Sequence, residues 1–213
     1  MARWKRWRTA RPLFIAVILG ACLSSGMAAC GFGNGPPPRK LTLTPVSDFP
    51  ANPRQVTWSL AVDEPSAGRQ IDTSQIGVMS GPFRIEYYSD AEWADAAPAM
   101  VRQLLVQSFR NTGRLPVVGS TRLSASADLM LISNLTKFQV ETAPNGSSQA
   151  VVALEVTLLR LPRRNPIGTA RFEKATPIPA NTIDTVAAAF NESLADVIRH
   201  TVSWTLERGA VGM

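Results

Sequence analysis

The 213-residue chain has a formal net charge of +6, from 22 lysines and arginines against 16 aspartates and glutamates. Five of the basic residues lie within the first eleven positions, so the chain from Cys30 onward keeps 17 of the 22 against all 16 acidic residues, a net charge of +1. A nearly neutral domain excludes the broad basic surface with which proteins bind nucleic acid.

Residues 1–29 have the three parts of an export signal. A basic start is followed by a wholly apolar run at residues 13–19 (LFIAVIL) and then by small residues. This order is typical of a cleaved signal peptide, and the absence of paired arginines favours ordinary secretion of an unfolded chain. The rest of the chain is therefore expected outside the cytoplasm, beside a membrane.

One of the two cysteines at the end of this signal is expected to carry a lipid. A bacterial lipoprotein signal ends in a cysteine that is acylated, and residues 19–22 (LGAC) and 27–30 (MAAC) both fit. Cleavage before Cys30 leaves no free thiol in the mature chain, whereas cleavage before Cys22 leaves Cys30 as an unpaired thiol. Cys30 is therefore the predicted lipidation site and Cys22 the alternative. An uncleaved anchor helix over residues 13–29 is the third interpretation, at the lower length limit for spanning a bilayer.

Residues 30–40 form a predicted tether between this lipid and a single domain. Glycines loosen the first half of the tether, and three consecutive prolines extend the second half at about 3 Å per residue. The domain is expected over residues 41–209, a length sufficient for a core without disulfides.

Strands are predicted at the start of the domain. The stretches LTLTP (41–45) and VTWSLAV (56–62) alternate with period two, which indicates half-buried strands. The stretches IGVMS (76–80) and FRIEYY (83–88) flank a Gly-Pro turn and predict a hairpin.

A helix is predicted to follow this hairpin. Ser89 and Glu92 have the spacing of a capping box, whereas Pro98 is tolerated only in a first turn and favours a start nearer Asp95. Gly113 is the expected stop. The apolar stripe of this helix consists of Val101, Leu104, Leu105, Ser108 and Phe109.

Three long antiparallel strands are predicted next, over residues 128–142, 149–161 and 168–175. The first two are joined around Pro-Asn-Gly, and Asn-Gly is a strong hairpin signal. A second amphipathic helix then begins near Asn181 and Asp184, which repeat the capping spacing, and is expected to end at Gly209. Its stripe consists of Val186, Phe190, Leu194, Val197, Ile198, Thr201 and Trp204.

These elements predict an α+β fold. The expected architecture is a two-layer sandwich in which two long amphipathic helices cover one face of a mostly antiparallel sheet. The other face of the sheet is either polar or covered by a partner.

The sequence contains no pattern typical of catalysis or metal binding. His200 is the single histidine, which excludes histidine-rich metal sites, and the chain has no G-x-S-x-G, Walker or G-x-G-x-x-G motif. We expect no enzyme, no cofactor and no metal. Arg160, Arg163 and Arg164 form a small basic patch at a hairpin tip, which fits an acidic partner, anionic headgroups or a solvated turn.

Several stretches resemble the ABC-type transport auxiliary lipoprotein family. The resemblance covers about residues 41–206 and includes LAVDEPSAGRQIDTSQIGVM, DLMLISNLTKFQVE and AAFNESLADVIRHTVSWTL. Its most specific part is IEYYSDAEWADAAPAMVRQLLVQSFRNTGR, in which Trp93, Asp95 and Pro98 precede the first helix. We interpret this motif as structural, an aromatic residue packed beside a helix cap; a partner contact through Trp93 and Asp95 is the alternative.

The resemblance implies a non-enzymatic accessory component of a mammalian-cell-entry (MCE) type lipid transport system. Its partners would be an MCE-domain protein and, through it, an ABC permease and ATPase, and family members sometimes assemble as homo-oligomeric rings. The implied location is the periplasmic side of the outer membrane, with the inner membrane as the alternative. Only the lipidated cysteine carries a chemical role. A different function left open is an outer-membrane assembly lipoprotein for lipopolysaccharide or polysaccharide export.

Overall fold

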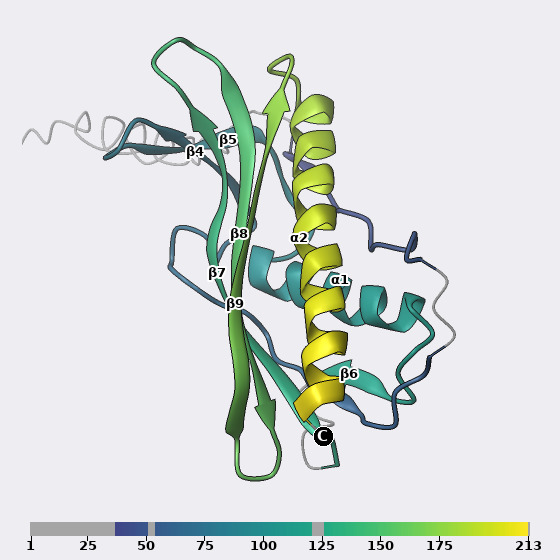
Figure 1. The fold of residues 1–213 in the computed structure, drawn as a ribbon. Coiled ribbons are helices and arrows are strands. Elements are labelled where there is room, and N and C mark those ends of the chain that lie inside the picture. Colours follow the sequence, from purple (N-terminus) through teal and green to yellow (C-terminus); the bar gives the residue numbers. More distant parts are fainter. Residues whose placement is uncertain (1–36, 51–53, 121–125, 213) are drawn as a thin grey trace, which may run out of the picture. The chain divides into compact units, whose positions relative to one another are not determined.

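The computed structural model describes residues 37–50, 54–120 and 126–212 (Figure 1). The predicted signal peptide and both cysteines lie outside these residues. The described chain forms one nine-stranded sheet and two helices. The elements are β1 (Arg39–Leu41), β2 (Leu60–Val62), β3 (Ser66–Ala67), β4 (Gln75–Ser80), β5 (Ile85–Trp93), α1 (Ala97–Asn111), β6 (Val118–Ser120), β7 (Leu129–Thr142), β8 (Ser148–Arg160), β9 (Asn165–Ile178) and α2 (Ile183–Gly212).

The predicted hairpins are confirmed. β4 and β5 pair antiparallel, and β7, β8 and β9 form the expected meander. Thr142 pairs with Ser148 across the β7–β8 turn, where Gly146 has φ +83°, a left-handed conformation that glycine adopts without steric cost. The three long strands of the meander form the main body of the sheet.

The remaining pairs correct the expectation of a mostly antiparallel sheet. Three short strands follow one another along the second edge of β7: β2 pairs with its first residues, β3 with its middle and β4 with its end. All three run parallel to β7, and β6 and β1 add parallel pairs to β2 and β5. The sheet is therefore mixed. Strands within residues 60–80 pair in parallel with β7, and the turn residues from which the hairpins were predicted do not reveal such pairs between distant strands.

β2 is shorter than the strand predicted over residues 56–62, and it is not half-buried. Its three residues are all completely buried. The reason is that β2 lies between β6 and β7, with both of its faces covered. Ala61, on the face away from the helices, packs with Met130 and Leu159 in a small second cluster.

The main core lies between the sheet and the two helices, which cover one face of it (Figure 1). The register of β7 shifts between Leu135 and Lys137, where one extra residue forms a bulge. Leu131 and Leu135 face the core before the bulge, and Phe138 and Val140 face it afterwards. This arrangement confirms the α+β class.

α1 begins at Ala97, and the capping box predicted at Ser89 and Glu92 is wrong. Both residues lie in β5, whose pairing with β4 extends to Glu92. The residue before the helix, Ala96, makes no capping hydrogen bond through its side chain, and Pro98 occupies the first turn. Strand pairing with β4 outweighs the local capping signal here.

The apolar stripes of both helices face the core as predicted. All five residues of the α1 stripe are buried, and Gly113 follows the helix with φ +63°. In α2, six of the seven stripe residues are buried and Trp204 is partly buried. The helical periodicity of the sequence therefore identified the buried faces correctly.

Both ends of α2 differ from the prediction. Thr182 and Thr185 form the cap, since the hydroxyl of each accepts a hydrogen bond from the backbone N–H of the other at 3.3 Å. The helix continues through Gly209 to Gly212. Gly209 does not turn the chain; it is buried against the ring of Trp58, where a larger residue has no room.

Candidate functional site

The structure describes how the chain joins the sheet after the predicted tether, although Cys30 and Cys22 lie outside the described residues. β1 begins at Arg39 and so includes the last two residues of the predicted tether; it pairs in parallel with β5, with Arg39 opposite Ala91. β1 runs in the same direction as β5, so its first residue, Arg39, lies at the end of β1 that is nearer to the side on which β5 begins. That side is the β4–β5 turn.

Polar contacts hold β1 at the edge of the sheet. Lys40 Nζ lies 2.8 Å from Glu92 Oε1, and the Ser74 hydroxyl donates to Glu92 Oε2 at 3.0 Å. The hydrogen bonds from Lys40 and then Ser74 hold the pKa of Glu92 below its ordinary value. The backbone N–H of Ala94 also donates to the Leu41 carbonyl at 2.7 Å. The strand nearest the predicted anchor is thus fixed by charge as well as by backbone pairing.

Trp93 lies in the core. Its side chain has no exposed area, and its ring centroid is 5.1 Å from that of Phe190 and 5.4 Å from that of Phe138. These rings join β5, α2 and β7, so Trp93 packs the interior and presents no surface to a partner. Asp95 is exposed and accepts a long hydrogen bond from Gln103 Nε2 at 3.4 Å. A partner contact through Asp95 stays a prediction.

The three arginines of the predicted basic patch lie at the β8–β9 turn but face different surroundings. Arg160 and, from α2, Arg208 line a hollow of about 380 Å³. Arg164 has φ +57°, and its Nη2 atom lies 3.6 Å from Met130 Sδ, on the sheet face away from the helices. Arg163 is exposed in the turn itself. The structure therefore brings Arg160 and Arg208 together, and the sequence had not linked these two.

The sheet face away from the helices carries a chain of ion pairs. It runs through Glu155, Arg171, Glu173, Lys137 and Glu141, with N-to-O distances between 2.9 and 3.3 Å. The hydrogen bond to Glu173 raises the pKa of Lys137, and the hydrogen bonds from Arg171 and Lys137 lower the pKa of Glu173. This part of the face is therefore polar, in agreement with one of the two alternatives for it; a covering partner stays a prediction.

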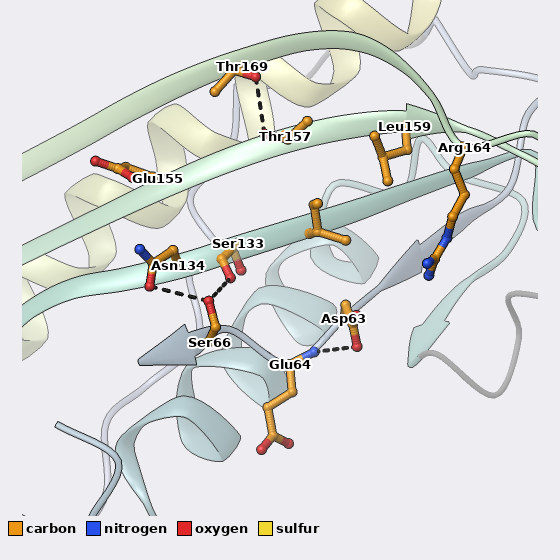
Figure 2. Close-up of a pocket in the computed structure, with 11 residues that line it drawn as sticks. Asp63, Glu64, Ser66, Ser133, Asn134, Glu155, Thr157, Leu159, Arg164 and Thr169 are labelled. Atoms are coloured by element: carbon orange, nitrogen blue, oxygen red, sulfur yellow. Dashed lines mark hydrogen bonds between the residues drawn. The ribbon is translucent and has the colours of Figure 1, made fainter. Parts of the chain in front are cut away.

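An open hollow of about 400 Å³ adjoins the ion pairs on the same face (Figure 2). On one side, the Ser66 hydroxyl bonds to the Ser133 carbonyl at 3.3 Å and to Asn134 Oδ1 at 3.2 Å. On the other side, the hydroxyls of Thr157 and Thr169 lie 3.1 Å apart. The lining contains neither histidine nor cysteine. Its hydroxyl, amide and carboxylate groups suit contact with a polar surface.

His200 lies on the surface of α2. Its Nδ1 atom is 2.9 Å from the Asp196 carbonyl, and its ring stacks on Phe172 with centroids 6.1 Å apart. Over residues 37–50, 54–120 and 126–212, no three histidine, cysteine or acidic side chains gather as metal ligands. The same residues include no helix with the length and hydropathy needed to cross a bilayer.

Two surface features were not recognised in the sequence. Phe83, in the β4–β5 turn, is 98% exposed. Its position directly after the predicted Gly-Pro turn could have indicated this exposure. The ion-pair chain could be found only after strand register was known. Lys137 and Glu173 belong to strands separated by β8, and nothing in their local sequences pairs them.

Comparisons with known proteins give a family and a fold. The model of the family described as ABC-type transport auxiliary lipoprotein component matches residues 41–201. An uncharacterized protein of Bradyrhizobium diazoefficiens is 25% identical over 185 residues, which are 82% of this chain and 47% of that protein, so the chain spans about half the length of this relative. The crystal structure of protein XCC0632 from Xanthomonas campestris has a TM-score of 0.71 and 28% identity, covering 82% of this chain and 95% of that one. A further uncharacterized protein, at 13% identity and a TM-score of 0.60, shares the fold over 77% of this chain and 99% of its own.

Proposed function

Because the chain belongs to the family of ABC-type transport auxiliary lipoprotein components, we propose that it is a non-enzymatic, lipid-anchored accessory component of a system that moves phospholipid between two membranes. Its direct partner is an MCE-domain protein, which connects it to the permease and the ATPase. ATP hydrolysis belongs to the ATPase, since the sequence printed here contains no Walker motif.

The anchor is a lipid on Cys30, with Cys22 as the alternative, in the periplasmic leaflet of the outer membrane. The basic, apolar and small-residue segments of residues 1–29 support export and lipidation. The tether of residues 30–40 gives the domain its distance from that membrane.

The observation that carries the proposal is that the β4–β5 turn and the arginines of the β8–β9 turn lie at opposite ends of β7. β1 runs parallel to β5, which begins at the β4–β5 turn, and β4 ends with Ser80 opposite Thr142, the last residue of β7. Arg160 pairs with Leu129, at the other end of β7. The two ends are 13 residue steps apart, or about 43 Å in a strand. In this proposal the β4–β5 turn faces the anchoring membrane, and the arginines of the β8–β9 turn, at the opposite end of β7, point away from it.

A cationic end directed away from the anchor suits an acidic protein surface across the periplasm. Arg160 and Arg163 are exposed, and Arg208 adds a third positive charge beside Arg160. Charge complementarity of this kind sets the rate and orientation of association, and it weakens as ionic strength rises.

The test is affinity purification of the full-length lipidated protein from detergent-solubilised native membranes. We expect MCE-domain protein, permease and ATPase to co-purify, and the double variant Arg160→Glu/Arg163→Glu to recover at least several-fold less of them. Arg69→Glu, an exposed arginine in the β3–β4 turn, is the matched control and should recover wild-type amounts. Recovery of the lipidated protein without any transporter component contradicts the proposal.

A further inference from the structure

The turn of the β4–β5 hairpin presents an apolar surface to solvent. Phe83 is 98% exposed, and the open side of the hairpin behind it carries Met79, Ile85 and Tyr87. Ile85 and Tyr87 lie on the same side, since a Cβ built on Gly77 would meet both. We call Phe83, Met79, Ile85 and Tyr87 the hairpin patch. In Figure 1 this hairpin reaches away from both helices.

The length of the chain between Cys30 and β1 puts the hairpin patch within reach of the predicted anchor. Arg39 lies opposite Ala91, and β5 begins at Ile85, on the side of the β4–β5 turn. The six residues from Ala91 back to Ile85 span about 20 Å of strand. The nine residues from Cys30 to Arg39 span up to about 28 Å when extended at about 3 Å per residue. The segment is therefore long enough for a lipid on Cys30 to reach the level of Phe83.

The charges around the turn favour a lipid surface. Residues 81–84 contain one arginine, Arg84, and no acidic residue, so the tip of the turn carries no charge that repels anionic headgroups. Glu86 points to the opposite side of the hairpin, where the Ser80 hydroxyl lies 3.4 Å from its carboxylate. Tyr87, 36% exposed, has the amphipathic ring that collects at the boundary between headgroups and acyl chains.

From these observations we infer that Phe83 inserts into the bilayer that holds the lipid anchor, as a second contact that fixes the orientation of the domain. The inference rests on the lipid anchor of the proposed function. A single anchored residue does not by itself set the orientation of the domain, whereas two contacts at the same level direct the β8–β9 turn toward the periplasm.

The experiment uses the full-length lipidated protein in vesicles of phosphatidylethanolamine and phosphatidylglycerol, with a fraction of brominated phospholipid that quenches tryptophan on contact. The domain suits this probe because Trp58 and Trp93 are buried and Trp204 is partly buried. Phe83→Trp is the test variant. Arg163→Trp, at the β8–β9 turn, is the matched control.

We expect all three proteins to float with the vesicles and Phe83→Trp to be quenched several-fold more than wild type or Arg163→Trp. Equal quenching of Phe83→Trp and Arg163→Trp in floating protein overturns the inference and leaves the anchor intact. Protein that does not float with the vesicles overturns both this inference and the proposed lipid anchor. If added transporter protein shields the introduced indole of Phe83→Trp and lipid does not quench it, the patch belongs to a protein partner, which also overturns the inference.

Discussion

Lys137 and Glu173 form an ion pair over Ala153. Lys137 Nζ lies 3.0 Å from Glu173 Oε1, and Ala153 is the register partner of both residues on the strand between them. Ala153 is completely buried although the helices cover the other face, because the two long side chains lie across it. A small residue at position 153 lets the charges meet.

This relationship predicts that Ala153→Leu separates the pair. Both charged side chains are about one-third exposed, so the pair itself contributes only about 0.5 kcal/mol after screening. We expect a double-mutant cycle with Lys137→Met and Glu173→Gln to give this coupling in the wild type and none in Ala153→Leu. Urea denaturation measures each free energy of unfolding. Ala210→Leu, on the exposed side of α2, should leave the coupling unchanged, and a coupling that persists in Ala153→Leu contradicts the prediction.

A second prediction concerns the contact between Gly209 and Trp58. A Cβ at position 209 would lie 2.4 Å from Trp58 Cζ2. Alanine normally stabilises a helix by about 1 kcal/mol relative to glycine, but here we expect Gly209→Ala to lower the free energy of unfolding by about 1–3 kcal/mol through overpacking.

Chemical denaturation of Gly209→Ala, beside Ser203→Ala on the exposed side of α2, measures this effect. In the double variant Gly209→Ala/Trp58→Phe we expect part of the lost stability to return, because phenylalanine has a smaller ring than tryptophan. The Trp58 indole N–H has no hydrogen-bond partner among the described residues, so its removal breaks no hydrogen bond there. Wild-type stability of Gly209→Ala would show that the ring moves aside freely.

Asp128 gives a prediction for acidic pH. Asp128 Oδ2 accepts hydrogen bonds from the Ser59 N–H at 2.8 Å and the Ser59 hydroxyl at 2.7 Å, and these bonds lower the pKa of Asp128. A pKa lowered in the folded state stabilises the fold above the ordinary aspartate value, about 3.9, and this stabilisation is lost as the pH falls through the folded value.

We expect Asp128→Asn to lower the free energy of unfolding at pH 7 by about 1 kcal/mol and to reduce its fall between about pH 5 and pH 2. Ser59→Ala removes one of the two donors and should change the acid dependence in the same direction, by less. Thermal unfolding across this pH range measures both. Identical pH profiles for wild type and Asp128→Asn would exclude the role given to this carboxylate.

The lipidation site is predicted independently of the fold. Intact-mass analysis of the protein from separated membranes should find a mature N-terminus at Cys30 carrying lipid, in the outer-membrane fraction. Cys30→Ala should then abolish lipidation, while Cys22→Ser should keep it. A mature chain that begins at Cys22 reverses this assignment, and recovery from the inner membrane corrects the proposed location.

The sequence alone determined the features that depend on neighbouring residues. The three strands of the meander and the buried faces of α1 and α2 follow from periodicity, turn residues and glycines that act within a few positions. The family resemblance and the anchor signal are also contiguous in the chain, and the resemblance is confirmed by the match over residues 41–201.

Tertiary structure alone decided what pairs along the second edge of β7. Leu60 lies opposite Leu129, 69 positions later, and no local pattern selects a parallel partner at that separation. That pairing buries Ala61 and makes the sheet mixed. The pairing of β5 with β4 keeps Ser89 and Glu92 in a strand instead of a helix cap. The pairing of β1 with β5 places β1 beside the β4–β5 hairpin, and the registers of β4 and β8 on β7 put Phe83 and the arginines of the β8–β9 turn at opposite ends of β7. Local periodicity fixes which face of an element is apolar, but the partner of that element depends on contacts between distant residues that form only in the folded chain.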